Sequence, residues 1–312
     1  MIAAMRITVL AGGVGAARFL DGLIRVTDPA EVTVICNVSD DFAWHGLFVC
    51  PDIDTVVYTL AGLEGDQGWG VRGDTRAALD ELTALGEDPW FLIGDRDLAT
   101  HVWRTERLRT GHPLSEVTRD LAAARGLACS LLPVTDDPHP TVVLTEDGPL
   151  GFQDYFVRRR ASDAVRGFRF PGAHAAQPAP GVLDALTTAD VVVFAPSNPF
   201  VSIAPILEVP GVREALAATA ARRIAVTPIV GGAAIKGPAA SMLASLGHAV
   251  SALAVARLYS RLVDTFVLDA VDAAEAPAVE ALGLRVCVTD TMMTSGERRD
   301  ALARAVLDAA AS

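Results

Sequence analysis

The sequence has a single lysine, Lys236, among its 26 basic residues, and its 38 acidic residues give a net charge of −12. No basic run is longer than the three arginines at residues 158–160, so the chain lacks the clustered positive charge that nucleic acids and anionic membranes attract. It also lacks any run of about 18 apolar residues, the length that a membrane-spanning helix needs. We therefore expect neither a nucleic acid nor a membrane as a partner.

Cysteines are few and scattered. None belongs to a C-x-x-C pair, a distribution that suits neither a disulfide framework nor a zinc site: Cys36, Cys50, Cys129 and Cys287. The first residues do not show the pattern of a signal peptide. We expect free thiols in a reducing compartment, which predicts a cytoplasmic protein. With 51% hydrophobic residues, the 312-residue chain can bury a sizeable core, and this composition excludes disorder.

Short runs of β-branched residues recur along the chain, and each ends in a cluster of glycine, proline, asparagine or aspartate. The runs lack polar alternation, as strands buried on both faces do, and helical periodicity follows most of them. The pattern predicts an α/β fold with a doubly wound, Rossmann-like parallel sheet, whose ligand lies outside the carboxyl ends of the strands. The predicted strands span residues 6–10, 31–36, 191–194, 224–226, 265–268 and 285–288.

The middle of the chain departs from this alternation. Residues 53–160 are expected to form a mostly helical insertion that also contains a β-hairpin. We place the strands of the hairpin at residues 141–145 and 151–157, on either side of a glycine-proline turn. With this insertion folded onto the sheet, residues 1–312 are predicted to form a single α/β domain.

A glycine turn follows the first predicted strand and leads into a helix. It consists of Gly12, Gly13, Val14 and Gly15. Such a turn lets the helix N-terminus approach a phosphate, although a tight turn that binds nothing is the alternative. The P-loop pattern is absent. The dinucleotide pattern G-x-G-x-x-G fails at Arg18, and the second predicted strand ends in Asn37 rather than a ribose-binding acid.

Four aspartates follow the second predicted strand closely: Asp40, Asp41, Asp52 and Asp54. Carboxylates gathered at the end of a sheet repel one another unless a cation lies among them, and oxygen ligands suit Mg²⁺. The alternative is that they cap helices or face solvent, which we expect of one or two of them. The cluster therefore predicts a Mg²⁺ cofactor. His45 lies beside it in sequence and is a candidate contact to a substrate.

Polar residues mark three further places. Asp95 and Arg96 stand at the start of a predicted helix, where they either bind a ligand or cap the helix. Ser197 and Asn198 lie between two prolines at a strand end, a turn that suits phosphate recognition. Lys236 lies in a glycine-rich loop, where it either clamps a phosphate or is solvated.

Seven segments that hold these motifs occur in order along the chain, at residues 11–20, 37–41, 45–47, 50–55, 94–97, 196–199 and 289–294. Together they resemble the 2-phospho-L-lactate transferase family of deazaflavin coenzyme F-420 biosynthesis, over essentially the whole length. The resemblance implies a Mg²⁺-dependent phosphotransferase. It would move a phosphoenolpyruvyl or 2-phospho-L-lactyl group from its GMP adduct to the ribityl hydroxyl of the deazaflavin Fo, releasing GMP.

The same resemblance implies roles for individual residues. Catalysis is expected at Asp40 and Asp54, and metal binding at these two and Asp41. The residues expected to contact Fo are Asp54, Asp52, His45, Asp95 and Arg96. Those expected to contact the nucleotide phosphates are Gly12, Gly13, Val14, Gly15, Ser197, Asn198 and Lys236. A homodimer is the expected assembly.

The donor and two other function classes stay open at this point. Ala17 and Arg18 stand where some members of the family carry Pro-Lys, and Lys236 stands where some carry serine; these forms resemble the bacterial branch, which implies the phosphoenolpyruvyl donor. A non-catalytic regulator of the same fold that binds a nucleotide sugar is the main alternative. A dinucleotide oxidoreductase is disfavoured, because the G-x-G-x-x-G motif and the ribose-binding acid are missing.

Overall fold

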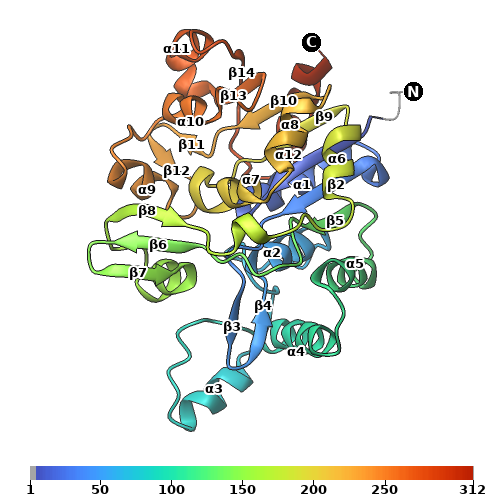
Figure 1. Ribbon diagram of the computed structural model, residues 1–312, viewed down its shortest axis with the longest axis vertical. Coiled ribbons are helices and arrows are strands. Elements are labelled where there is room, and N and C mark those ends of the chain that lie inside the picture. The colour runs from blue at the N-terminus through green and yellow to red at the C-terminus, as the bar shows by residue number, and fades with distance from the viewer. Residues whose placement is uncertain (1–4, 312) are drawn as a thin grey trace.

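The computed structural model describes residues 5–311, which are built around a seven-stranded sheet (Figure 1). The strands run in the spatial order β14-β13-β10-β9-β1-β2-β5, and all neighbours are parallel. The order reverses between β1 and β9, so the doubly wound, Rossmann-like fold predicted from the sequence is confirmed. The strands are β1 (Ile7–Ala11), β2 (Val32–Cys36), β5 (Ser130–Pro133), β9 (Val191–Phe194), β10 (Arg222–Val226), β13 (Thr265–Asp269) and β14 (Arg285–Thr289).

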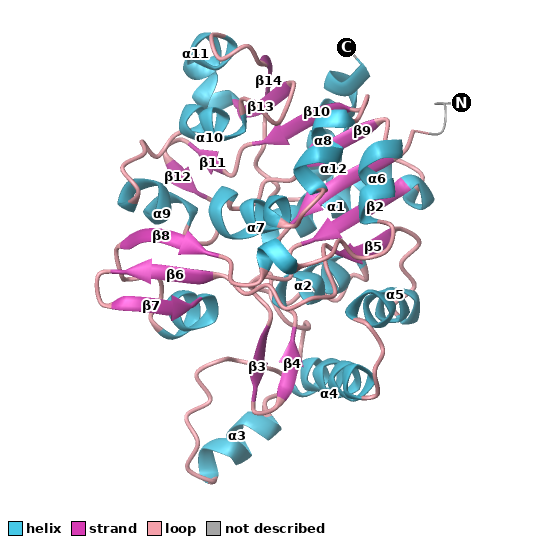
Figure 2. Ribbon diagram, in the orientation of Figure 1, coloured by secondary structure: helices cyan, strands magenta, loops and turns pink. Residues whose placement is uncertain are grey.

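Helices cover both faces of this sheet, which explains why its strands lack polar alternation (Figure 2). Every residue of β1, β9 and β13 is buried. Helix α1 packs against α12 on one face, and α6 packs against α8 on the other. The helices of the main fold are α1 (Gly13–Val26), α6 (Val182–Thr188), α7 (Ala204–Glu208), α8 (Val212–Ala218), α9 (Ala239–Ser245), α10 (Ala252–Tyr259), α11 (Ala276–Glu280) and α12 (Gly296–Ala311). Within residues 5–311, no helix is both long and apolar enough to cross a membrane.

The segment predicted as an insertion, residues 53–160, contains helices and short strands, and part of it belongs to the main sheet. Its helices are α2 (Pro51–Leu60), α3 (Ala77–Ala84), α4 (Asp95–Arg109) and α5 (Leu114–Ala124). Helix α2 packs against α1, and β5 pairs with β2 at the edge of the sheet. The sequence did not predict β5 because the strand has four residues and none of them is β-branched. A small antiparallel hairpin, β3 (Phe42–Trp44) and β4 (Leu47–Val49), precedes α2.

The predicted hairpin exists, with its second strand shifted. Strand β6 (Val142–Thr145) pairs with β7 (Gly148–Gly151), so the second strand begins inside the predicted turn. Residues 154–157, expected in that strand, belong instead to a π-helical turn that spans Asp154–Arg158. Strand β8 (Val165–Arg169) pairs with β6 on its other side and completes a three-stranded sheet. A two-residue pairing of β11 (Ile229–Val230) with β12 (Ala233–Ala234) lies nearby.

The glycine turn after β1 packs directly on the turn after β9. A Cβ atom on Gly15 would overlap the carbonyl oxygen of Pro196, and Gly13 has a φ of +72°, which favours glycine. The two turns therefore meet at the point where the strand order reverses. Such a switch point is where doubly wound sheets bind their ligands.

We predict that Gly15→Ala lowers the free energy of unfolding by about 3 kcal/mol, because backbone must move to admit the added methyl group. The measurement is urea unfolding followed by tryptophan fluorescence. Gly151→Ala is the matched control, since its added Cβ would meet only a carboxylate oxygen of Asp154, at 3.5 Å. Equal stability of the two variants would contradict the close contact between the turns.

Candidate functional site

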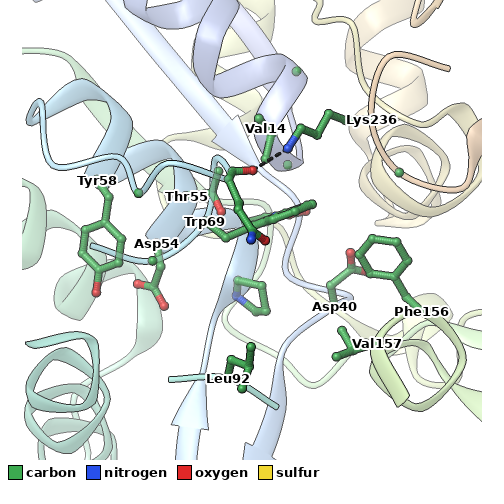
Figure 3. Close-up of a pocket in the computed structure, with 18 of the residues that line it drawn as sticks. Val14, Asp40, Asp54, Thr55, Tyr58, Trp69, Leu92, Phe156, Val157 and Lys236 are labelled. Carbon is green, nitrogen blue, oxygen red and sulfur yellow. Dashed lines mark hydrogen bonds between the residues drawn. The ribbon is translucent and has the colours of Figure 1, made fainter. Parts of the chain in front are cut away.

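A cavity of about 1130 Å³ opens at the carboxyl ends of the strands (Figure 3). Its wall combines the glycine turn, the acidic residues after β2, the loop after α2 and the turn after β9. Cavities that hold one drug-sized ligand measure roughly 300–1,000 Å³. This one is therefore large enough for a ligand of dinucleotide size or for two smaller substrates together.

The glycine turn presents the N-terminus of α1 to this cavity. Gly12, Gly13, Val14 and Gly15 all line the wall, and helix α1 begins at Gly13. No acidic side chain lies in the first turn of the helix itself, and Asp52 of α2 meets this end from outside by accepting a hydrogen bond from the Gly13 N–H. An anionic group, such as a phosphate, is the ligand that this end favours.

Ser197 and Asn198 also line the cavity, but their side chains hold the turns together. The Ser197 hydroxyl donates to the Gly12 carbonyl at 2.9 Å and accepts from the Gly12 N–H at 3.3 Å. The Asn198 carbonyl oxygen accepts from the Phe200 N–H at 2.9 Å, and its amide faces the sulfur of Met242 at 3.3 Å. Both residues therefore shape the turn, and a ligand would meet their remaining hydrogen-bonding capacity only.

Asp40 and Asp52 bring uncompensated negative charge to the cavity wall. Burial, reinforced by the neighbouring Asp52 and Asp41, raises the pKa of Asp40 well above its ordinary value, and its buried Oδ1 has no hydrogen-bond partner. Burial also raises the pKa of Asp52 to about 6, against the opposing effect of hydrogen bonds from Asn37 and Gly13. Neither acid has an ion-pair partner among the described residues. A cation would stabilise this pair.

Asp41 lies next in the chain but does not line the cavity. Both of its carboxylate oxygens are buried without a conventional partner, and the Cys50 thiol and Arg104 are the groups that favour its charge. Burial is the larger effect and raises the pKa of Asp41. The structure thus separates Asp41 from the cavity that Asp40 faces, although sequence analysis expected both to bind one metal.

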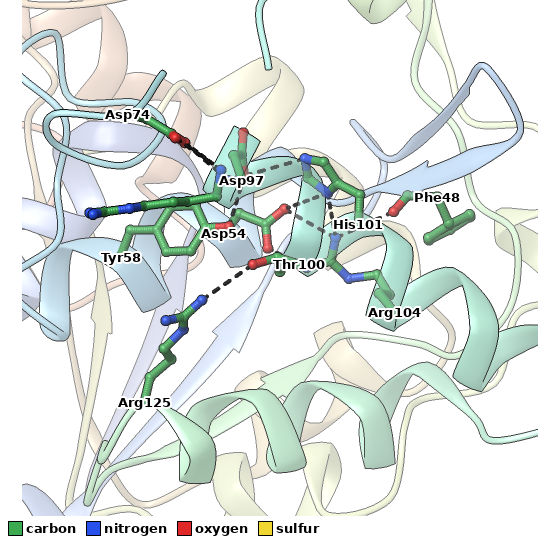
Figure 4. Close-up of polar contacts among 10 residues, drawn as sticks. Phe48, Asp54, Tyr58, Asp74, Asp97, Thr100, His101, Arg104 and Arg125 are labelled. Atoms are coloured by element: carbon green, nitrogen blue, oxygen red, sulfur yellow. Dashed lines mark hydrogen bonds and ion pairs between the residues drawn. The ribbon is translucent and has the colours of Figure 1, made fainter. Parts of the chain in front are cut away.

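Asp54 lies on another part of the wall, where a buried arginine neutralises it (Figure 4). Arg104, on α4, is only 1% exposed and contacts both carboxylate oxygens of Asp54, one of them at 3.1 Å. Its Nη1 also donates to the Phe48 carbonyl at 3.3 Å and to His101 Nδ1 at 3.2 Å. Asp54 therefore carries a charge that is already compensated, unlike Asp40.

Three further residues complete this buried group, Tyr58 of α2 with Asp97 and His101 of α4, and the sequence analysis named none of them as a ligand contact. The Tyr58 hydroxyl donates to Asp97 Oδ1 at 2.7 Å, and burial raises the pKa of Tyr58 above its usual value. Asp97, His101 and Arg104 are spaced i, i+4 and i+7, which puts them on one face of α4. That spacing is visible in the sequence and is the signal that could have found them.

The structure places three expected substrate contacts outside the cavity. Asp95 caps α3 instead: it accepts the N–H groups of Ala77 and Ala78 at 3.0 and 2.9 Å, and the Thr75 hydroxyl is the main reason for its lowered pKa. The Arg96 side chain is exposed, and its N–H donates to Asp74. His45 lies at the exposed tip of the β3–β4 hairpin, with a φ of +46°.

Aromatic rings and the only lysine surround the mouth of the cavity. The Lys236 ammonium lies 4.7 Å from the centre of the Trp69 ring and donates to the Gln67 carbonyl. Trp69 meets Phe156 edge-on at 6.4 Å, and Phe156 stacks on Phe152 at 5.5 Å. Trp69 is exposed and Phe156 is half-buried, and aromatic side chains of this kind lining a cavity suit a flat, sparingly polar ring.

Comparisons with known proteins show what the chain is similar to. The family model described as 2-phospho-L-lactate transferase CofD matches residues 7–298. Proteins named phosphoenolpyruvate transferase from Streptomyces griseus and Mycolicibacterium smegmatis are 48% and 41% identical, covering 98% of this chain and 98% and 99% of their own. Crystal structures of a Bacillus halodurans protein, one described as a member of the UPF0052 family, align with TM-scores of 0.62 and 0.65. They cover 96% and 97% of this chain and 98% and 99% of their own, and at 16% and 17% identity they show a shared fold.

We predict that Asp40→Asn is more stable than the wild type at pH 8. The pKa of Asp40 is higher in the folded than in the unfolded chain. The contribution of the Asp40 carboxyl to the free energy of unfolding therefore falls as the pH rises above the pKa that this group has in the unfolded chain. The gain of the variant should therefore shrink as pH is lowered towards 4. Urea unfolding at several pH values measures it, with the exposed Asp147→Asn as control. A variant less stable at every pH would contradict the uncompensated charge.

Proposed function

The chain belongs to the 2-phospho-L-lactate transferase CofD family, and from this we propose that it is a Mg²⁺-dependent phosphotransferase of coenzyme F-420 biosynthesis. The group transferred is phosphoenolpyruvyl, from its GMP adduct, and the acceptor is the ribityl hydroxyl of Fo. The relatives that carry the name phosphoenolpyruvate transferase support this donor over phospholactate. The observation that carries the proposal is a single cavity in which a helix N-terminus and the uncompensated acid Asp40 meet.

The nucleotide phosphates fit the N-terminus of α1. The turn after β1 brings backbone to the wall without side chains at Gly12, Gly13 and Gly15, and the helix end supplies positive potential. The Lys236 ammonium contacts a backbone carbonyl and an aromatic ring rather than a carboxylate. It can therefore move to a phosphate without leaving a buried carboxylate unpaired.

Of the three acids expected to bind Mg²⁺, Asp40 fits best. It has a buried carboxylate oxygen without a partner, it lines the cavity, and Asp52 lies near enough to raise its pKa. Asp41 does not reach the wall, and Asp54 is neutralised by Arg104. Bound there, Mg²⁺ would offset the negative charge that Asp40, Asp52 and the phosphates bring together.

The chain positions the reactants rather than reacting with them. In the proposed transfer, the ribityl oxygen of Fo forms a bond to the phosphorus that carries the small acid, the bond from that phosphorus to GMP breaks, and the proton of the ribityl hydroxyl is released. This direct displacement requires no covalent intermediate with the protein. Catalysis is therefore expected to come from orientation and charge neutralisation. The deazaflavin ring would lie against the aromatic mouth near Trp69 and Phe156.

The test is an end-point assay with purified protein, Fo and the guanylyl adduct of either phosphoenolpyruvate or 2-phospho-L-lactate, read by chromatography with fluorescence detection. We expect a Mg²⁺-dependent shift of the deazaflavin peak with equimolar GMP. Asp40→Asn should lose activity by about 100-fold or more, since several kcal/mol of charge stabilisation depend on the ion. Asp147→Asn, exposed on the hairpin turn, is the matched control.

The outcomes separate the candidates. Preference for the phospholactyl adduct would correct the donor and leave the transferase in place. No product with either adduct, from protein that binds GDP and is folded, would favour the nucleotide-binding regulator instead.

A further inference from the structure

We propose that Gln153 is a positioning residue for Asp40, and that it acts by holding the backbone of this acid in place. The Gln153 side chain is 7% exposed, and its amide donates to the Asp40 carbonyl oxygen at 3.1 Å. Both residues line the cavity, although 113 positions separate them in the chain. The bond joins the segment after β7 to the loop after β2, on the side of the cavity where Figure 3 shows Asp40 and Phe156.

The carboxylate of Asp40 is not fixed by a cation. Its Oδ1 is buried without a hydrogen-bond partner, and among the described residues no arginine or lysine pairs with it. Asp54 differs in this respect, because Arg104 contacts both of its carboxylate oxygens. The position of the Asp40 carboxylate therefore depends on how firmly the backbone of its loop is held.

The hairpin of β6 and β7 holds this backbone from both of its ends. The Thr141 N–H, just before β6, donates to the Ser39 carbonyl at 2.7 Å. Gln153, just after β7, donates to the next carbonyl in the chain, that of Asp40. A side-chain amide is neutral. It can therefore fix the loop without offsetting the negative charge that the carboxylate presents to the cavity.

The neighbouring acid is held in a similar way. Asn37 is fully buried, and its amide donates to Asp52 Oδ2 at 2.8 Å and to the Val201 carbonyl at 3.2 Å. Both acids of this pair are thus placed by neutral amides. Carboxylates that are held in a fixed geometry and keep their charge are what a cation site requires, and the groups behind such ligands set their orientation.

The alternative is that Gln153 only attaches the hairpin to the rest of the fold. Apolar packing already does this, because the adjacent Phe152 is buried in a hydrophobic cluster with Val143 and Tyr155. The hydrogen bond to the Asp40 carbonyl adds direction to a segment that is anchored without it. We therefore assign the bond to the placement of the acid.

This inference rests on the proposed function, in which Asp40 binds Mg²⁺, and it adds a residue that acts on the ion through Asp40. Loss of the Gln153 amide would let the loop after β2 shift. The ion would then be bound more weakly, while the N-terminus of α1 and the nucleotide phosphates expected there would be unaffected. Gln153 variants should therefore separate the affinity for the metal from the affinity for the nucleotide.

The test measures Mn²⁺ binding by electron paramagnetic resonance, without nucleotide. Gln153→Met keeps the length of the side chain and removes its amide, and we expect the dissociation constant for Mn²⁺ to rise about 5- to 10-fold. Loss of a group behind a metal ligand commonly weakens binding by about 10- to 100-fold, and a bond to the backbone should lie at or below the lower limit. Gln177→Met is the matched control, because this exposed amide only approaches the Ala175 carbonyl, at 3.5 Å.

Two further measurements separate positioning from a purely structural role. Binding of GDP in the absence of metal should be unchanged in Gln153→Met. In the transferase assay, the Mg²⁺ concentration for half-maximal rate should rise, and the rate at saturating Mg²⁺ should stay within about 2-fold of the wild type. Gln153→Ala serves in its place if Gln153→Met does not fold.

The contrary outcomes are distinct. A Gln153 variant that is less stable to urea but binds Mn²⁺ as the wild type does would overturn the inference, as would an equal loss of affinity in Gln177→Met. A wild type that binds no Mn²⁺, or whose Mn²⁺ site persists in Asp40→Asn, would overturn the inference together with the metal site of the proposed function.

Discussion

The contact between two backbone turns sets the geometry on which the rest of the site depends. Gly15 lies against the Pro196 carbonyl, and Gly12 exchanges hydrogen bonds with the Ser197 hydroxyl, so the loops after β1 and β9 form one unit. This unit presents the start of α1 to the cavity. Asp52 is packed beneath it, held by the Asn37 amide at 2.8 Å. The acids after β2 are thereby kept at a fixed place relative to the helix end, although no ion pair joins them to it.

The sheet and its polar ends could be predicted from sequence because both depend on local patterns. A strand buried on both faces has to be almost continuously apolar, as β9 and, apart from Thr8, β1 are, and it has to end in residues that tolerate a turn. The glycine turn, Asp40 and Ser197 follow such strands directly, and all of them line the cavity. Strand β5 shows the limit of this reasoning, since Ser130–Pro133 is placed by its pairing with β2 and has no β-branched residue.

The acidic residues of α4 show why part of the site could not be predicted. Asp95 and Asp97 stand two positions apart, on different faces of the helix, and only tertiary packing determines which of them faces the cavity. Asp95 is used at the start of α3, where backbone N–H groups need an acceptor. Asp97 can be recognised as part of the site only from the folded structure, in which Tyr58 of α2 donates a hydrogen bond to it. The i, i+4, i+7 spacing of Asp97, His101 and Arg104 is present in the sequence. Asp54, which pairs with Arg104, lies 50 positions away in the chain.

Lys236 carries the only side-chain amine in the sequence, because every other residue counted as Lys or Arg is an arginine. Its side-chain amine is exposed, lies over the Trp69 ring, and belongs to the wall of the cavity. Guanidinium groups do not react with acylating reagents at neutral pH, whereas an amine does. An amine-directed fluorophore would therefore attach to one side chain, beside an indole that quenches or transfers energy to it. The protein carries, without any engineering, a labelling position at the entrance of its own binding site.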